Sequence, residues 1–298
     1  DINNPESPIN ISNNTFTDAQ SINNYFVVNG FATAVRTNLL GDRFKNTTDI
    51  SDVYQANLKA GQTLRLQVSD SKNTTNNESG FEGDLDLILF NSQYEELKRS
   101  ELDSEFESLI VPAQISGDES YFIQVLAFSG TSKYVLSLEP APVASPASTF
   151  RPANFSTDEA IIKFKAPRSS SKSSTFGALS EKESFSISAA QKTHNNSSLV
   201  LSHTSFSRPL LAKFNSSIQA QALNTNKSST TSLPAFEHEL QSLNPDSYKR
   251  YKTLNIIKEF RVRDDVEYAQ PNYIRTAHQI PNDPFYSDQW HYPQINLP

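Results

Sequence analysis

The sequence contains no cysteine and no methionine, and it has only eight glycines and one tryptophan in 298 residues. Without cysteine, the chain can form neither a disulfide framework nor a thiolate metal site. No apolar run approaches the roughly 20 residues that span a bilayer, so we expect no membrane insertion. Because methionine is missing even at position 1, we expect that a leading segment, such as a signal peptide, has been removed.

The chain also lacks an excess of positive charge. Acidic residues outnumber lysine and arginine by 33 to 26, which gives a formal net charge of −7. No dense basic stripe with interleaved aromatic residues occurs, and such a stripe is what tracks a phosphate backbone. We therefore expect no nucleic-acid partner.

Alternating apolar residues dominate the first half of the chain. Residues 1–20 are polar and Asn-rich, which predicts a flexible arm. The stretch 53–68 places Tyr54, Ala56 and Leu58 on one side and repeats this period after a turn, so we expect a hairpin. Further strands are predicted at 84–90, 121–128 and 133–139. The pattern is typical of an all-β antiparallel sandwich, jelly-roll-like, over residues 21–139.

The second half reads as an α+β domain behind a linker. Residues 140–158 are rich in proline and small residues, which indicates a linker between two separately folded units. The order after it is strand, helix, strand, strand, helix, strand, which predicts a ferredoxin-like domain over 159–278. We expect the strand at 160–165 to be central and antiparallel to the last one. The elements expected here are a strand at 159–167, a weak helix at 179–191, two strands joined at Arg208-Pro209, helical stretches within 233–263 and a strand at 266–270.

No catalytic constellation is visible. A serine hydrolase needs a serine activated by an oriented histidine, commonly on a Gly-x-Ser-x-Gly turn, and no such turn occurs near any histidine. The pattern also lacks a histidine pair for zinc and a Gly-rich loop for phosphate, so we expect no enzymatic activity and no cofactor. The five histidines are at positions 194, 203, 238, 278 and 291.

One acidic pair has two interpretations. Asp84 and Asp86 lie on the same side of a predicted strand. They can be half of a calcium site, since calcium takes carboxylate ligands. They can also be ordinary acids on the solvent-facing side of an amphipathic strand, which is the interpretation we prefer.

Two stretches carry a family resemblance in the second half. They are "EAIIKFKAP" at 159–167 and "TLNIIKEFRVRDDVEYAQPNYIRTA" at 253–277, followed by "PNDPFYSDQWHYPQINLP" at 281–298. Together they resemble the propeptide of subtilisin-like serine proteases and the first arm of the mature enzyme. The resemblance implies that residues 279–298 begin that arm. It also implies that Arg275, Thr276, Ala277 and His278 form an inhibitory tail that occupies the protease cleft.

The first half resembles the pre-peptidase C-terminal (PPC) domain, a β-sandwich that accompanies secreted bacterial proteases. The stretches that carry this likeness are "DISDVYQANLKAGQTLRLQV" at 49–68, "DLDLILF" at 84–90 and "YFIQVLAFSGTSKYVLSL" at 121–138. The two resemblances imply the front part of a secreted, bacterial subtilisin-like protease precursor, whose partner is the catalytic domain of the same precursor.

Two functions follow from these resemblances. The first is a non-catalytic pro-region that acts as intramolecular chaperone and temporary inhibitor. The alternative is a binding or secretion-assisting module, in which the β-sandwich attaches the protease to a substrate or to the cell surface. An enzyme in its own right would need a nucleophile that the sequence does not present.

Overall fold

The computed structural model of the chain is mostly β, with two helices in the part of the chain that it describes. No helix in that part is long and apolar enough to cross a membrane. The described residues are 12–22, 27–34, 49–68, 83–102, 104–112, 120–140, 154–165, 200–201, 209–214 and 234–274.

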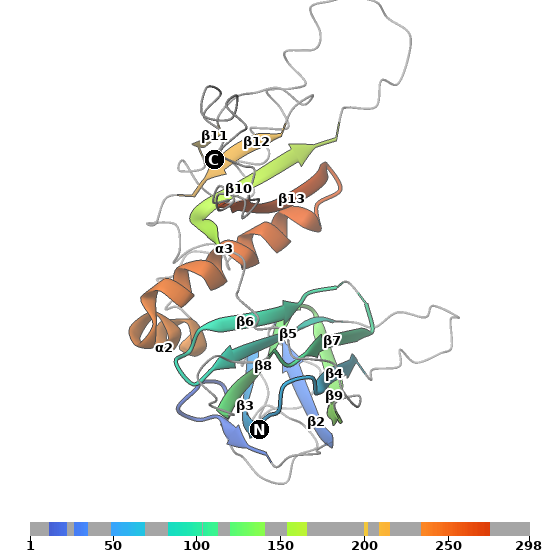
Figure 1. The fold of residues 1–298 in the computed structure, drawn as a ribbon. Coiled ribbons are helices and arrows are strands. Elements are labelled where there is room, and N and C mark those ends of the chain that lie inside the picture. Colours follow the sequence, from blue (N-terminus) through green and yellow to red (C-terminus); the bar gives the residue numbers. More distant parts are fainter. Residues whose placement is uncertain are drawn as a thin grey trace, which may run out of the picture.

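The first nine strands form two sheets that lie face to face (Figure 1). The five-stranded sheet has the order β1-β3-β8-β5-β6, and the four-stranded sheet has the order β2-β9-β4-β7. All neighbours are antiparallel except β1 and β3. The strands are β1 (Gln20–Ser21), β2 (Val27–Thr33), β3 (Ser51–Asn57), β4 (Thr63–Val68), β5 (Asp84–Asn91), β6 (Glu96–Ser100), β7 (Phe106–Ile110), β8 (Ser120–Ser129) and β9 (Thr131–Glu139).

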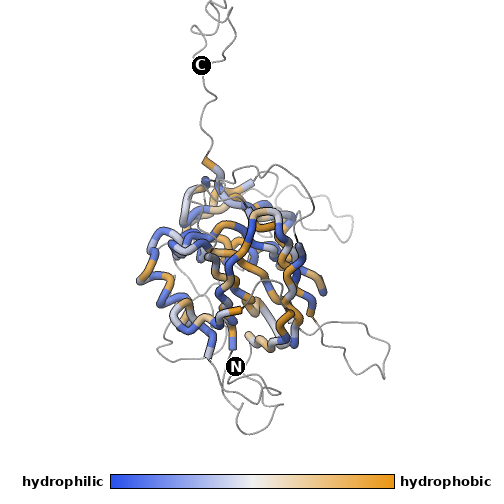
Figure 2. The backbone as a smooth tube through the Cα atoms, turned by 60° about the horizontal axis from the view of Figure 1, so that its bottom comes forward, coloured by the Kyte–Doolittle hydropathy of each residue, from blue (hydrophilic) through white to orange (hydrophobic). Residues whose placement is uncertain are grey.

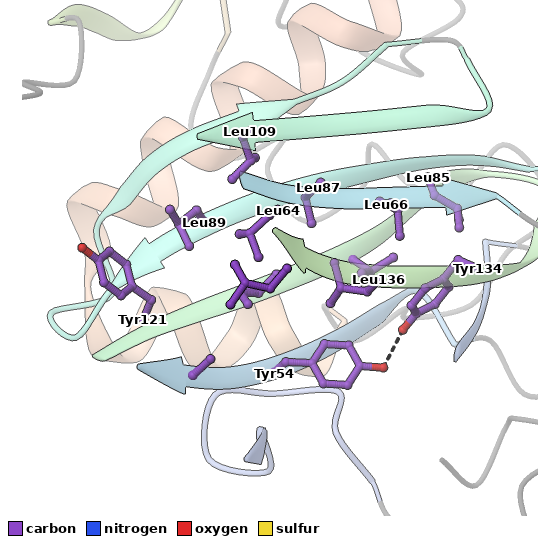
Figure 3. Close-up of a cluster of buried hydrophobic side chains, with 14 of the residues drawn as sticks. Tyr54, Leu64, Leu66, Leu85, Leu87, Leu89, Leu109, Tyr121, Tyr134 and Leu136 are labelled. Atoms are coloured by element: carbon purple, nitrogen blue, oxygen red, sulfur yellow. Dashed lines mark hydrogen bonds between the residues drawn. The ribbon is translucent and has the colours of Figure 1, made fainter. Parts of the chain in front are cut away.

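A leucine-rich core fills the space between the two sheets (Figure 3). Alternate residues of β4 point inward, so that Leu64 and Leu66 are buried while Arg65 is exposed. They meet the inward side chains of β5, among them Leu85 and Leu87, in one buried cluster. The inward faces predicted from the period of two are confirmed, and Figure 2 shows the same alternation of apolar and polar residues along the strands.

The pairing of two strands differs from the prediction. The strands at 51–57 and 63–68 were expected to form a hairpin, but β3 pairs with β8 and β1, whereas β4 pairs with β9 and β7. The chain therefore crosses from one sheet to the other at this turn. Both strands still bury the predicted side chains, because alternation specifies which face is buried and not which strand lies alongside.

In the described part of the second half, four strands and two helices follow the sandwich, and one of these strands is only two residues long. The small sheet has the order β11-β12-β10-β13, with β10 central and antiparallel to β13 as predicted. β10 begins at Phe155, inside the stretch expected to be linker. The elements are β10 (Phe155–Phe164), β11 (Val200–Leu201), β12 (Leu210–Lys213), α2 (Ala235–Leu243), α3 (Pro245–Arg261) and β13 (Val266–Tyr273).

Local signals explain where α3 begins. Asn244 caps the helix, because its side-chain Oδ1 accepts a hydrogen bond of 3.0 Å from the backbone N–H of Ser247. Pro245 takes the first position, where no N–H is needed. At the other end Lys258 and Arg261 lie in the last turn, where a positive charge is favourable.

Helix α3 is buried on two sides. Ile256, Ile257 and Phe260 pack against the small sheet, whereas Tyr248 and Tyr251 pack against the five-stranded sheet of the sandwich. The helices thus lie between the small sheet and the sandwich (Figure 1). Each half of the chain has a buried cluster of its own, and both halves contribute to a third one. The expectation of two separately folded units stays a prediction.

The cluster that joins the two halves is rich in aromatic rings. Phe236 of α2 lies 4.8 Å from Phe16 and 5.8 Å from Phe90 of β5, measured between ring centroids. Phe16 is only 5% exposed, so residues 12–20 are not the flexible arm that the polar composition predicted. One phenylalanine, inserted among Phe90, Tyr94 and Phe122, fixes this segment to the sandwich.

Candidate functional site

The strand β13 forms one edge of the small sheet and leads toward the predicted tail. Among the described strands it pairs with β10 alone. Its residues Tyr268, Gln270 and Tyr273 are exposed. An edge strand with unpaired main-chain groups is a surface to which an extended chain or a partner strand can bind.

One face of the small sheet is left bare by the helices. Ala160 and Ile162 point toward α3, so Ile161 and Lys163 must point to the opposite face. There Ile161 lies beside Leu211 of β12 and Gln270 of β13, because cross-strand partners share a face. Lys163 and Tyr268 form the next row. In Figure 1 both helices lie on the side that faces the sandwich.

The end of β13 is held firmly. The backbone N–H of Ile274 donates to the carbonyl of Asn154 at 2.9 Å. The ring of Tyr273 meets Phe155 edge-on at 6.4 Å, and the guanidinium of Arg250 lies 4.2 Å from the centre of the Phe155 ring. The chain is therefore positioned by these contacts up to Ile274, the residue before the predicted tail.

Side-chain hydrogen bonds to α3 and to the neighbouring strand β10 hold β13 in its register. Arg261 of α3 donates from Nε to the carbonyl oxygen of Ala269 at 2.8 Å. Asn272 donates to the Glu159 carboxylate at 2.8 Å, and Lys213 lies 3.1 Å from the same carboxylate. The hydrogen bonds from Asn272 and Lys213 lower the pKa of Glu159, which keeps this acceptor ionised.

Comparison of the sequence with family models and with curated proteins finds no match.

The predicted inhibitory tail, Arg275, Thr276, Ala277 and His278, lies outside the described residues, as do residues 279–298 and the helix expected at 179–191. The tail and the arm therefore stay predictions. What the structure adds is the strand that immediately precedes them and the contacts that hold it.

The preferred interpretation of Asp84 and Asp86 is wrong. The two carboxylates do share one side of β5, but they are only 7% and 0% exposed. Lys258 of α3 lies 2.9 Å from Asp84 and also contacts Asp86. An ammonium group thus occupies the place between the two acids that a calcium ion would take. Burial raises the pKa of Asp86 to about 7, although the adjacent Lys258 acts in the opposite direction.

Sequence reasoning missed the role of the lysines on α3. Lys258 is only 2% exposed and Lys252 only 3% exposed. Lys252 binds the carboxylate of Glu237 at 3.0 Å, and the Nζ of Lys258 also lies 4.3 Å from the centre of the Phe128 ring. The available signal was the alternating pair Asp84 and Asp86, since buried acids require a cation.

The described residues include one histidine, the exposed His238 of α2. Within the same part of the chain, no group of three or more His, Asp or Glu side chains is arranged to hold a metal ion.

Proposed function

We propose that this chain is the non-catalytic pro-region of a secreted subtilisin-like serine endopeptidase. In this proposal a PPC-like, jelly-roll-like sandwich precedes a ferredoxin-like propeptide. The pro-region acts as an intramolecular chaperone and a temporary inhibitor, and its tail, residues 275–278, occupies the cleft of the catalytic domain.

The observation that carries the proposal is the edge strand β13 beside the sheet face that the two described helices do not cover. The order β11-β12-β10-β13 supports the ferredoxin-like assignment, because it is the order that two interleaved β-α-β units produce. The face with Ile161, Leu211 and Tyr268 offers apolar surface for a folded partner. The tail leaves from the same sheet, so both contacts can form at once.

The strength of each contact explains why the sheet face and the tail would bind the catalytic domain together. A main-chain hydrogen bond contributes only about 0.5 to 1.5 kcal/mol net, so a short extended tail binds weakly alone. A docked sheet raises the effective concentration of the tail at the cleft. The contacts of Ile274 with Asn154 and of Tyr273 with Phe155 fix the direction in which the tail begins.

The test is inhibition of the catalytic domain of the same precursor by residues 1–278. Replacing Ile161 and Tyr268 together by serine should raise the inhibition constant at least about tenfold, since central apolar anchors dominate protein interfaces. The control is Val27→Ser, which removes an exposed apolar side chain from β2 of the sandwich. Equal inhibition by the double variant and the control would contradict docking through this face.

A second function, attachment to a surface through the sandwich, is favoured by one feature of β7. Phe106 and Ile110 are 57% and 55% exposed and point to the same outer face of this edge strand. Replacing both by serine should abolish binding to substrate or cell surface while inhibition persists. Loss of inhibition in this variant would contradict the division of roles.

A further inference from the structure

Residues 12–22 form a short segment, which we call the strap, along the outer edge of the five-stranded sheet. The backbone N–H of Val53 donates to the carbonyl of Asn13 at 2.6 Å, and the N–H of Ile22 donates to the carbonyl of Gln55 at 2.9 Å. The strand within the strap, β1, is two residues long and pairs with β3 in parallel. A few main-chain hydrogen bonds thus attach the strap to the sandwich.

The strap also binds helix α2 through the carboxylate of Glu239. The backbone N–H groups of Phe16 and Thr17 donate to this carboxylate at 2.5 and 3.0 Å, and the hydroxyl of Thr17 is a third donor. The backbone N–H of Asp18 donates to the hydroxyl of Thr15 at 3.2 Å, which holds the turn that presents these donors. Hydrogen bonds to a charged acceptor are stronger than neutral ones. The strap therefore connects the edge of the sandwich to α2.

One side chain makes most of the apolar contact of the strap. The ring centroid of Phe16 lies 4.9 Å from that of Tyr94, 5.0 Å from that of Phe122 and 4.8 Å from that of Phe236 on α2. Ala19 packs against the same cluster, and most other strap residues are polar. A segment held by one aromatic anchor and a few hydrogen bonds is bound as a peptide ligand is bound, because a few anchors dominate such interfaces.

The strap contributes mainly to the cluster that joins the two halves. Phe16 belongs to that cluster. None of the buried residues of the other two clusters comes from the strap, and Ile22 only packs against the one inside the sandwich. Strand β3 pairs with β8 on its other side over residues 51–57, so it stays in the sheet without the strap. Loss of the strap should therefore weaken the contact between the halves and leave the core of each half intact.

We infer that the strap is a detachable peptide ligand of the surface formed by Phe122, Phe236 and Glu239, and that its release loosens α2 and α3 from the sandwich. Cleavage of the chain between the strap and β2 permits this release. The same surface accepts in trans a peptide of the same chemistry, in which an aromatic residue precedes a threonine. The inference is independent of the proposed inhibitory function.

The experiment uses the full chain with a recognition sequence for a specific protease inserted between Ile22 and Val27. The folded protein is cut there, and gel filtration in excess unlabelled strap peptide tests whether the strap leaves. Binding of a fluorescent peptide of residues 12–22 to the stripped protein is then measured by anisotropy. The matched peptides carry Phe16→Ala or Asp18→Ala, because Asp18 is an exposed strap residue. Amide hydrogen exchange of α2 and of β4 is compared before and after the strap leaves.

We expect the strap to leave and the peptide to bind in its place. Phe16→Ala should weaken the peptide about a hundredfold or more, the usual effect of deleting a buried ring, and Asp18→Ala should not. Exchange in α2 should become at least about tenfold faster without the strap and return to its original rate when the peptide is added, whereas exchange in β4 should not change.

A matched pair of variants tests the contact with α2. In the stripped protein, Glu239→Gln should weaken the peptide about tenfold, since a charged acceptor is lost, and Gln241→Ala, an exposed change on the same helix, should not. A strap that excess peptide does not displace would overturn the inference. Equal binding of the two altered peptides, or equal exchange in α2 with and without the strap, would also overturn it. These results come from the cut protein with its natural surface, so they decide the matter even if Glu239→Gln fails to fold.

Discussion

Replacing Lys258 by methionine removes the ammonium group that contacts both Asp84 and Asp86. Methionine keeps an unbranched apolar side chain in the same space, so the change isolates the charge. The two carboxylates remain almost fully buried. Deleting one partner of a buried ion pair typically costs about 3 to 5 kcal/mol, because an uncompensated charge stays in the interior. This is a large part of the free energy of unfolding of a typical folded domain, which is about 5 to 15 kcal/mol.

The pH dependence of this loss follows from the acids. Without the ammonium group, the chain folds more easily when Asp84 and Asp86 are protonated. Each proton taken up on folding changes the free energy of unfolding by up to about 1.4 kcal/mol per pH unit. The destabilisation by Lys258→Met should therefore be larger at pH 8 than at pH 5. Adding Asp84→Asn and Asp86→Asn should recover part of the loss, because neither of these two positions then carries a buried charge; Glu107, a buried acid near Lys258, remains.

The assay is urea unfolding followed by circular dichroism at both pH values. The control is Lys249→Met on the same helix, since Lys249 is 48% exposed and lies 3.6 Å from the exposed Asp246. Such a surface pair contributes about 0 to 1 kcal/mol. If Lys258→Met costs no more than Lys249→Met, or if its effect does not change with pH, the argument that α3 is joined to the sandwich by this ion cluster is refuted.

Three other changes test the fold. Ile162→Asp should unfold the small sheet, because Ile162 is fully buried and an unpaired buried carboxylate costs several kcal/mol; an unchanged thermal melt would show that β10 is not central. Gly30→Ala should destabilise the sandwich by about 1 to 3 kcal/mol. A Cβ there would lie 2.2 Å from Cζ of Tyr134, and a neutral effect in urea unfolding would contradict that close approach. In the unaltered chain, the contribution of Asp86 should fall as pH rises from its ordinary pKa of 3.8 toward the folded value of about 7, because the folded state then holds the proton more tightly. Stability that rises over this range, or that keeps the same pH slope in Asp86→Asn, would contradict the raised pKa.

Much of the local structure follows from the sequence because the signals are local. Alternating Leu64 and Leu66 predict a strand and its buried face, and the apolar spacing of Ile257 and Phe260 predicts a helix. The position of β10 at the centre of its sheet was predicted from the order of the elements. The spacing of apolar residues indicates which side of a strand or helix is buried, and for these elements the structure agrees with the prediction.

The contacts between the two halves could not be predicted in the same way. Lys258 meets Asp84 across 174 positions of the sequence, and no local pattern pairs them. Phe16 lies in a polar stretch, so its burial depends on the rings that other segments bring around it. The hydrogen bond from the backbone N–H of Thr17 to Glu239 likewise spans 222 positions of the sequence.

The most direct test of the proposed function compares two chains as inhibitors of the catalytic domain of the same precursor. One chain ends at His278 and the other at Ile274, so that both retain β13 and the hydrogen bond from Ile274 to Asn154. Competitive inhibition that is strong for the longer chain and lost for the shorter one is the predicted result. Equal inhibition by both chains, or none by either, would contradict a tail that occupies the protease cleft.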